Sequence, residues 1–251
     1  MVCSLRLRGL LFALGALLIF GLPACCCIML VNSWGRVASQ VNLRWSPSDP
    51  RIFVTPGDAS VQATVRSAVY GNVNPARDEE LRLYLRLLYD WVSTNIRVRS
   101  DSLYPVLPSL PNGQVSFISE VWQFPNETLT LRSGDCEDSA TLLLSMIRFY
   151  APRLKAFCIV VEGGRGGHMA VIVSNGSGVA ILDPGLYYCT SDEVGRVKFK
   201  PLMYELEKWL ALVKQRFGSE ARVTMLFNEE TYASFRSTSE FIAFFLLKID
   251  A

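Results

Sequence analysis

The spacing of apolar residues predicts two amphipathic helices. The first spans residues 78–96, where acidic side chains at the start suit the positive end of the helix dipole. Its apolar residues follow intervals of four, three and four, which is one helical face: Leu81, Leu85, Leu88 and Val92. The second helix runs from Cys136 to about Tyr150, and Pro152 helps to end it.

Three short apolar runs after the second helix predict a β-sheet. They cover residues 156–161, 168–173 and 179–182, are rich in valine and isoleucine, and are separated by glycine-rich turns. That arrangement is typical of consecutive antiparallel strands. The later part of the chain adds an amphipathic helix, a late strand and one further candidate strand: 202–217, 222–227 and 196–199. Helices followed by a sheet predict an α+β fold.

Two segments before the second helix carry weaker patterns. We interpret residues 32–76 as a stalk followed by a strand-bearing extension packed on the main domain. Within it, residues 51–55 and 60–70 are expected to form short strands. Residues 97–132 contain four prolines and predict a long loop. A loop of that length in a compact domain is usually functional or flexible.

The chain begins with an uncharged apolar run. Gly9–Val31 spans 23 residues without a charge, enough for a helix to cross a bilayer core of about 30 Å. Arg6 and Arg8 closely precede it, so the positive-inside rule favours a cytoplasmic segment 1–8 and an extracytoplasmic main domain, 77–251. The alternative is a cleaved signal with a lipoprotein-type site at Cys25. Because the run stays apolar beyond Cys25, we favour an uncleaved membrane anchor.

Composition narrows the function classes. Half of the residues are apolar and 19% are charged, so the chain can bury a core. The net charge of +2, without a basic block, argues against a nucleic-acid partner. One histidine and scattered cysteines offer no paired zinc-ligand spacing. The three cysteines outside the N-terminal segment are too few for a disulfide framework, although a Cys158–Cys189 bond stays open.

Three residues form a candidate catalytic set. Cys136 lies in the first turn of the second helix, on its core face, where the helix N-terminus favours a thiolate. His168, the only histidine, begins a strand, and Asp183 ends the next strand. Neighbouring antiparallel strands can bring that imidazole and carboxylate together, and the packed helix would add the nucleophile. The helix has a polar face as well: Glu137, Thr141, Ser145 and Arg148.

Each of these residues alone has an ordinary structural explanation. A buried cysteine on a helix is usually part of the core, a single histidine at a strand start is usually incidental, and Asp-Pro-Gly is a common turn. Their order along the chain, on a helix start, a strand and the next strand, is much less expected by chance. The combination therefore favours a cysteine-based catalytic site.

The motifs around these residues resemble those of transglutaminase-like cysteine enzymes. Gly134–Asp138 with 139–143 resembles their nucleophile motif, and Gly167–Val171 and Ile181–Pro184 resemble their histidine and aspartate strands. Trp122–Leu129 is similar to the segment before the nucleophile in the bacterial and archaeal branch, which includes periplasmic cysteine proteinases. The resemblance covers about residues 81–186.

The resemblance implies a papain-like fold, in which the nucleophile helix packs on an antiparallel sheet, and thiol attack on an amide carbonyl. Water resolves the acyl-enzyme in a protease, and an amine resolves it in a transglutaminase. The substrate would be a protein or peptide. An oxyanion donor is also needed. The Cys136 amide is one candidate, and Gln123 or Trp122 could supply a second.

Three acids crowd the candidate nucleophile: Asp135, Glu137 and Asp138. Their charges should raise the pKa of Cys136 and oppose the helix dipole. One interpretation is that they only stabilise the helix start. The other is a calcium site, because calcium prefers such oxygen ligands and the periplasmic proteinases that share this motif bind calcium through such acids.

The sequence thus predicts a membrane-anchored cysteine peptidase or amidase, extracytoplasmic, with Cys136 as nucleophile, His168 as general base and acid, and Asp183 as the group that orients the imidazole. No other cofactor is required by that chemistry. Two alternatives stay open. One is a catalytically silent binding module with the same fold, and the other is a protein-crosslinking acyltransferase.

Overall fold

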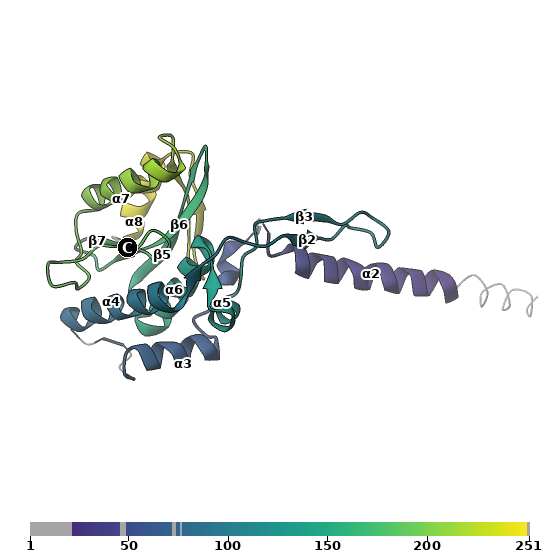
Figure 1. Ribbon diagram of the computed structural model, residues 1–251, viewed down its shortest axis with the longest axis horizontal. Coiled ribbons are helices and arrows are strands. Elements are labelled where there is room, and N and C mark those ends of the chain that lie inside the picture. The colour runs from purple at the N-terminus through teal and green to yellow at the C-terminus, as the bar shows by residue number, and fades with distance from the viewer. Residues whose placement is uncertain (1–21, 46–48, 72–73, 76, 250–251) are drawn as a thin grey trace, which may run out of the picture. The chain divides into compact units, whose positions relative to one another are not determined.

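The computed structural model describes residues 22–45, 49–71, 74–75 and 77–249, which fall into two units. The smaller unit holds helix α2 (Leu22–Asn42) and a hairpin of strands β2 (Tyr104–Val106) and β3 (Ser116–Ile118) (Figure 1). Within it, the indole Nε1 of Trp34 donates to the carbonyl of Pro108 at 2.9 Å.

The expected membrane span, Gly9–Val31, lies largely outside the described residues. Only positions 22–31 are described, and they form the first part of α2. Among the described helices, none has both the length and the apolar character required to cross a bilayer.

A six-stranded antiparallel sheet forms the centre of the larger unit, in the order β10-β9-β5-β6-β7-β8. The three central strands confirm the predicted consecutive runs: β5 (Lys155–Gly163), β6 (Gly166–Ser174) and β7 (Val179–Asp183). The outer strands are β8 (Tyr188–Cys189), β9 (Arg222–Phe227) and β10 (Tyr232–Ser234). The candidate strand at 196–199 is wrong, because Val197 forms only an isolated bridge with Ser191.

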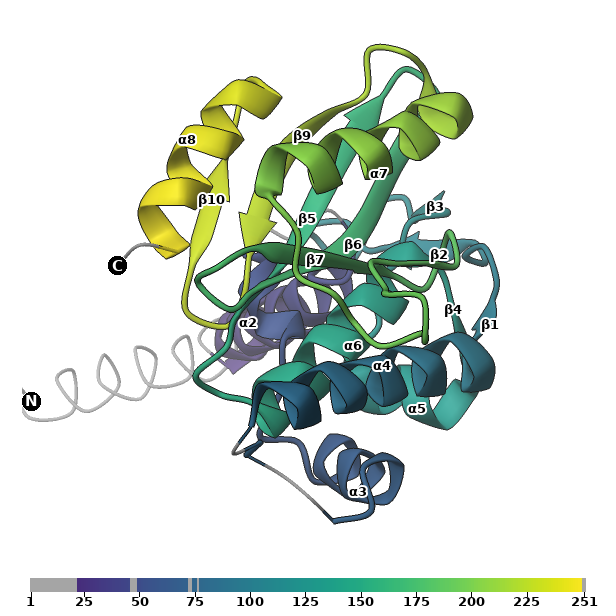
Figure 2. The ribbon, with the colours of Figure 1, turned by 90° about the vertical axis from the view of Figure 1, so that its left-hand side faces the viewer.

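Helices cover both faces of this sheet (Figure 2). One face carries α3 (Ala59–Ala68), α4 (Asp78–Asn95), α5 (Pro125–Leu131) and α6 (Cys136–Tyr150), and the other carries α7 (Leu202–Phe217) and α8 (Thr238–Ile249). Side chains along β6 alternate between the two cores. Met169, Val171 and Val173 face α6, whereas Ala170 and Ile172 face α7. The mixed helix-and-sheet fold predicted from the sequence is thereby confirmed.

Helix α6 is buried nearly all round, and most of its predicted polar face is buried as well. Cys136 is half-buried, and the rest of the core face is fully buried: Ala140, Leu143, Leu144 and Ile147. Thr141 and Ser145 are fully buried too. The reason is that α3, α4 and α5 cover the side away from the sheet. The buried hydroxyls are satisfied locally, because Thr141 donates to the Glu137 carbonyl at 2.8 Å and Ser145 to the Thr141 carbonyl at 2.7 Å.

The extension at 49–71 is helical, so the two predicted strands there are wrong. A short 3₁₀ helix, η2 (Pro50–Phe53), replaces the first and α3 replaces the second. Asp58 caps α3 by accepting from the amides of Ser60 and Val61. Fully buried valines lie four residues apart at 61, 65 and the C-cap 69, so helical spacing outweighs the β-propensity of valine. As predicted, this extension packs into the main core.

The segment 97–132 contains regular elements and is not one loop. The β2–β3 hairpin occupies its middle and α5 its end. Strand β1 (Arg97–Val98) pairs in parallel with β4 (Ser133–Gly134), immediately before α6. Residues 97–99 therefore lie beside the segment that carries Cys136.

The sheet register separates two of the cysteines. Cys158 on β5 lies opposite Val171, Val171 lies opposite Leu182, and Leu182 lies opposite Cys189 on β8. Three strand spacings put the two cysteines about 14 Å apart, too far for a disulfide. Both are free thiols, so the pairing left open by the sequence does not occur.

Candidate active site

Cys136 occupies the first position of α6, as the sequence predicts. The backbone before it folds tightly over the helix. A Cβ added to Gly134 would come within 2.6 Å of both Cβ and Oδ2 of Asp138. A glycine is therefore needed at this position for Asp138 to pack beneath the turn that presents Cys136.

His168 and Asp183 form a buried pair. Nε2 of His168 lies 2.7 Å from Oδ2 of Asp183, and both side chains are almost completely buried. The amide of Leu186 donates to the other carboxylate oxygen at 2.9 Å. The carboxylate thus holds one ring nitrogen, which leaves Nδ1 as the nitrogen that can exchange a proton with a nucleophile.

The pair lies on the sheet face opposite α6. Residues two apart on a strand point to the same face of the sheet. His168 therefore shares a face with Ala170, and Asp183 with Ile181, and both of these neighbours face α7. The sequence predicted that the nucleophile helix packs on this sheet, and α6 does pack on β6. Cys136 approaches from the α6 side, whereas the imidazole lies against two aromatic rings of α7.

The two sides meet at Gly185, just beyond the end of β7. A Cβ built there would lie 3.1 Å from Cε1 of His168 and 3.4 Å from Cβ of Cys136. These distances share one point, so their sum, 6.5 Å, is the greatest possible separation of the two side-chain carbons. The missing side chain at Gly185 leaves the space through which the thiol and the imidazole can approach.

Helix α7 contributes two aromatic residues that sequence reasoning missed. Nε1 of Trp209 donates to Oδ2 of Asp183 at 2.8 Å. The ring of Phe217 stacks on His168 with centroids 5.3 Å apart and planes 20° apart. The two aromatics lie eight residues apart on one helix face, a signal that the sequence carried but that nothing tied to the dyad. They fix the imidazole and shield its bond to Asp183 from water.

Burial and charge hold the Cys136 thiol in its neutral form. Burial raises the pKa of Cys136 well above its ordinary value, and the carboxylates of Glu137 and Asp135 raise it further. The thiol Sγ lies 3.3 Å from Oε2 of Glu137. A hydrogen bond from the backbone amide of Met169 acts in the opposite direction and favours the thiolate. Of the three acids predicted to raise this pKa, Glu137 and Asp135 contribute to the shift.

The two oxyanion candidates have different environments. Gln123 donates to Asp138 twice, through its backbone amide at 2.7 Å and its side-chain amide at 2.6 Å. It therefore lies beside the first turn of α6. Trp122 packs in the core against Phe53 and Phe227, with ring centroids 5.3 and 5.9 Å apart. The environment of Gln123 suits the predicted role better than that of Trp122.

The acidic group differs in membership from the predicted calcium set. Carboxylate oxygens of Asp101, Asp135 and Asp138 all lie within 4.8 Å of one another. Glu137 is not part of this cluster, and its Oε2 contacts Sγ of Cys136 instead. Asp101 was missed because it lies 34 residues before Asp135 in the sequence. Oδ1 of Asp135 is buried and accepts no hydrogen bond from the described residues.

The shifts in the pKa values of these acids have one main cause. Burial raises the pKa of Asp138 to about 8 and also raises the pKa of Asp135. Neighbouring carboxylates add to the shift at Asp138. Oxygen atoms from three acids, one of them buried and unpartnered, match the hard ligands that calcium prefers. The residues present therefore fit a calcium ion in kind, with further oxygens required from backbone or water.

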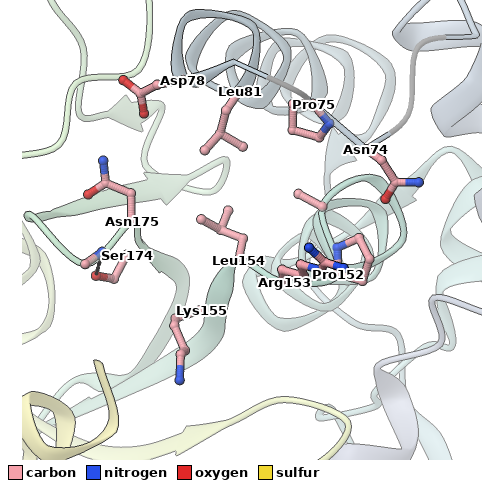
Figure 3. Close-up of a pocket in the computed structure, with 12 residues that line it drawn as sticks. Asn74, Pro75, Asp78, Leu81, Pro152, Arg153, Leu154, Lys155, Ser174 and Asn175 are labelled. Carbon is pink, nitrogen blue, oxygen red and sulfur yellow. Dashed lines mark hydrogen bonds between the residues drawn. The ribbon is translucent and has the colours of Figure 1, made fainter. Parts of the chain in front are cut away.

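A large cavity of this unit lies elsewhere. It measures about 880 Å³ and is lined by residues that include Asp78, Leu154, Lys155, Ser174 and Asn175 (Figure 3). Ser174 ends β6, whereas His168 lies six residues earlier on the same strand, about 20 Å away at the usual rise. This cavity is therefore separate from the Cys136–His168–Asp183 group.

No protein-family model matches the chain, and neither does any curated protein sequence. Solved structures give loose matches. Legionella pneumophila LapG is 15% identical with a TM-score of 0.39, covering 87% of this chain and 96% of LapG, and its calcium-bound form gives the same identity and score, covering 88% and 99%. A candidate cysteine protease from Cytophaga hutchinsonii is 14% identical with a TM-score of 0.34. That match covers 79% of this chain, which spans 58% of the length of the Cytophaga protein. At these scores the resemblance assigns no role to any residue here.

Proposed function

We propose that this protein is a cysteine hydrolase of peptide or amide bonds. The observation that carries the proposal is the convergence at Gly185 of a helix-borne thiol, Cys136, with the imidazole of a buried His168–Asp183 pair. A nucleophile, a base and an orienting carboxylate from three separate elements are the parts that acyl transfer requires.

In the proposed reaction, Nδ1 of His168 takes the proton of the Cys136 thiol as Sγ attacks the substrate carbonyl carbon. A carbon–sulfur bond forms, and the carbonyl oxygen becomes an oxyanion that the Cys136 amide and the Gln123 side chain would stabilise. The intermediate collapses, the carbon–nitrogen bond breaks, and His168 gives its proton to the leaving amine. Water, activated by His168, then hydrolyses the thioester and restores the thiol.

Calcium would act on the acids beside the nucleophile. Asp101, Asp135 and Asp138 are the residues that would hold it. A bound cation would offset the negative charge that now raises the pKa of Cys136. The proposed hydrolase is therefore expected to be more reactive in calcium than in chelator.

The location of the enzyme belongs to the same proposal. The charge pattern around residues 9–31 supports a membrane anchor with the main domain, 77–251, on the extracytoplasmic side. The relevant experiment is protease accessibility in intact cells against permeabilised cells, with a tag at the C-terminus. An extracytoplasmic domain is digested in both, and protection in intact cells contradicts the orientation.

The catalytic proposal is tested by labelling thiols with iodoacetamide and measuring each cysteine by mass spectrometry. Cys136 should react faster than Cys158 and Cys189, and His168→Ala should slow it about tenfold or more. The matched control is Cys158→Ala, which removes a buried thiol on β5 and should leave Cys136 labelling unchanged. Equal labelling of Cys136 in wild type and His168→Ala contradicts the proposal.

One observation favours a second function, a silent binding module. Burial, together with the charge of Glu137 and its contact with Cys136 Sγ, holds the thiol neutral in this state. A hydrolase requires that block to be removable, so Glu137→Gln should increase labelling of Cys136. If that variant and saturating calcium both leave Cys136 unreactive, the binding module is the better account. Incorporation of a labelled amine into glutamine-bearing proteins, without hydrolysis, would instead support crosslinking.

A further inference from the structure

We propose that a second, smaller cavity beside Cys136 binds a carboxylate of the substrate, supplied by an acidic side chain or by a free chain end. The inference deepens the proposed function, on which it rests, by naming a substrate class. The cavity measures about 410 Å³, within the usual range for ligand sites. Its lining includes Arg97, Arg132 and Tyr187, together with the end of α4.

Two lining residues of the cavity are close in the chain to the reacting groups. Arg132 precedes Cys136 by four residues, and Tyr187 follows Gly185 by two. Those separations correspond to at most about 14 Å and about 7 Å along the chain. An extended peptide advances about 3.3 Å per residue, so a side chain about two to four residues from the scissile bond would reach the cavity.

The two guanidinium groups supply the recognition chemistry. Arg97 and Arg132 are exposed, and within the described residues neither forms an ion pair. Their backbones are joined, because the Arg97 amide donates to the Arg132 carbonyl at 3.0 Å. The Arg132 guanidinium lies 5.1 Å from the centre of the Trp91 ring. Two arginines at one cavity offer the forked donors that match a carboxylate.

Backbone conformation provides an independent observation. In the described residues, four positions other than glycine have a positive φ, and two of them, Arg132 and Tyr187, line this cavity. Both have a φ of 53°. Glycine or asparagine would adopt that conformation more readily. Arg132 in addition ends α5, at a cap where glycine is usual.

Large side chains at two disfavoured positions indicate that the side chains themselves are used. A residue type that disfavours its own backbone conformation lowers stability, and such residues are expected at functional sites. Tyr187 is 69% exposed, so it is not retained for core packing. Beside the two arginines, it supplies an apolar wall for the stem of an acidic residue.

The test uses the full-length Cys136→Ala protein and fluorescein-labelled octapeptides that carry either glutamate or glutamine at one position at a time. A further matched pair ends in a free carboxylate or in an amide. Fluorescence anisotropy should show binding about tenfold or more tighter for the acid at one or two adjacent positions, or for the free chain end. Which pair shows the preference identifies the source of the carboxylate.

Variants separate recognition from folding. Arg132→Asn and Arg97→Gln should each bring the acid-to-amide ratio toward one, and Arg132→Asn should keep or raise the thermal midpoint. The matched control is Tyr70→Asn, because Tyr70 also has a positive φ, of 52°, and does not line this cavity. It should leave the ratio unchanged.

Two results overturn the inference. One is the lack of any acid preference in any pair, including the lack of binding. The other is a preference that survives Arg97→Gln and Arg132→Asn together. Cleavage by the wild-type protein is measured separately on the same peptides. Acid-selective binding without cleavage contradicts only the hydrolase, and cleavage without acid preference contradicts only the carboxylate site.

Discussion

The indole of Trp209 and the carboxylate of Asp183 share a hydrogen bond of 2.8 Å, made to the same oxygen that lies 2.7 Å from Nε2 of His168. One carboxylate oxygen thus accepts from two partners on two different elements. Because Trp209 is fully buried, this bond exists in a dry environment where it fixes the carboxylate strongly. The orientation of the imidazole therefore depends on α7 as well as on the sheet.

Trp209→Phe tests that dependence, since phenylalanine keeps an apolar ring but has no N–H. A hydrogen bond to a charged group contributes about 1.5–3 kcal/mol, and a comparable loss in positioning lowers the labelling rate of Cys136 about tenfold or more. The measurement is the rate constant for iodoacetamide at Cys136. The control is Trp34→Phe, which removes an indole bond in the other unit. A rate in Trp209→Phe equal to that of Trp34→Phe would show that the bond has no positioning role.

Gly185→Ala tests the convergence of the thiol and the imidazole. The new methyl group would lie 3.1 Å from His168 Cε1, closer than ordinary contact, so the ring must shift. A displacement of a reacting group by about 1 Å can lower the rate about a hundredfold. We expect hydrolysis and Cys136 labelling to fall by tenfold to about a hundredfold. Gly57→Ala is the control, because nothing lies within 4 Å of its added Cβ. Unchanged kinetics in Gly185→Ala would mean that the two groups meet elsewhere.

The parts of the fold that could be predicted are the segments whose apolar residues recur at helical or strand spacing. The stripe in α4 and the alternating strands β5 to β7 are set by burial on defined faces, which the sequence records directly. The failure at α3 is of another kind. Its valines have a high β-propensity, and only the spacing of the buried ones, together with the Asp58 cap, reveals a helix.

The candidate site could be predicted in its members but not in its geometry. Cys136 begins α6, Asp183 ends β7, and His168 is the only histidine in the sequence, so all three stand out. The face on which His168 lies depends on register, and one residue of slip reverses it. Trp209 and Asp101 reach the site through tertiary contacts with residues 26 and 34 positions away. No local pattern identifies such partners.

Calcium should stabilise the protein through the three aspartates Asp101, Asp135 and Asp138. Binding to the folded state alone raises the free energy of unfolding by about 2.7 kcal/mol at a hundred times the dissociation constant. The thermal midpoint of the wild type should therefore rise with calcium and fall with chelator. Asp101→Asn should lose most of that response.

The control for the calcium experiment is Asp90→Asn, which alters a surface carboxylate paired with Arg86. It should retain the full response to calcium. A midpoint that does not depend on calcium in the wild type, or that depends on it equally in Asp101→Asn, contradicts the site.

Asp58 should stabilise the fold in a pH-dependent way. Its carboxylate accepts from the amides of Ser60 and Val61 at 2.8 and 3.2 Å, and a hydrogen bond from the Ser60 hydroxyl is the main cause of its lowered pKa. Because the folded pKa is lower than the unfolded value of about 3.9, the stabilisation is present above that value. It is lost as the pH falls through the folded value.

Asp58→Ala should lower the free energy of unfolding by about 1 kcal/mol at pH 7, measured by urea denaturation. The difference from the wild type should shrink as the pH falls below the unfolded value of about 3.9 and through the lower folded value, where the wild-type carboxyl takes up a proton. Asp58→Asn separates capping from charge, since its side-chain oxygen still accepts but does not titrate. It should stay close to the wild type at pH 7 and lose no stability through this position on acidification. A constant difference between wild type and Asp58→Ala at pH 7 and pH 3 would show that the charge of the cap does not contribute, and that the Asp58 side chain stabilises α3 only as a neutral hydrogen-bond acceptor.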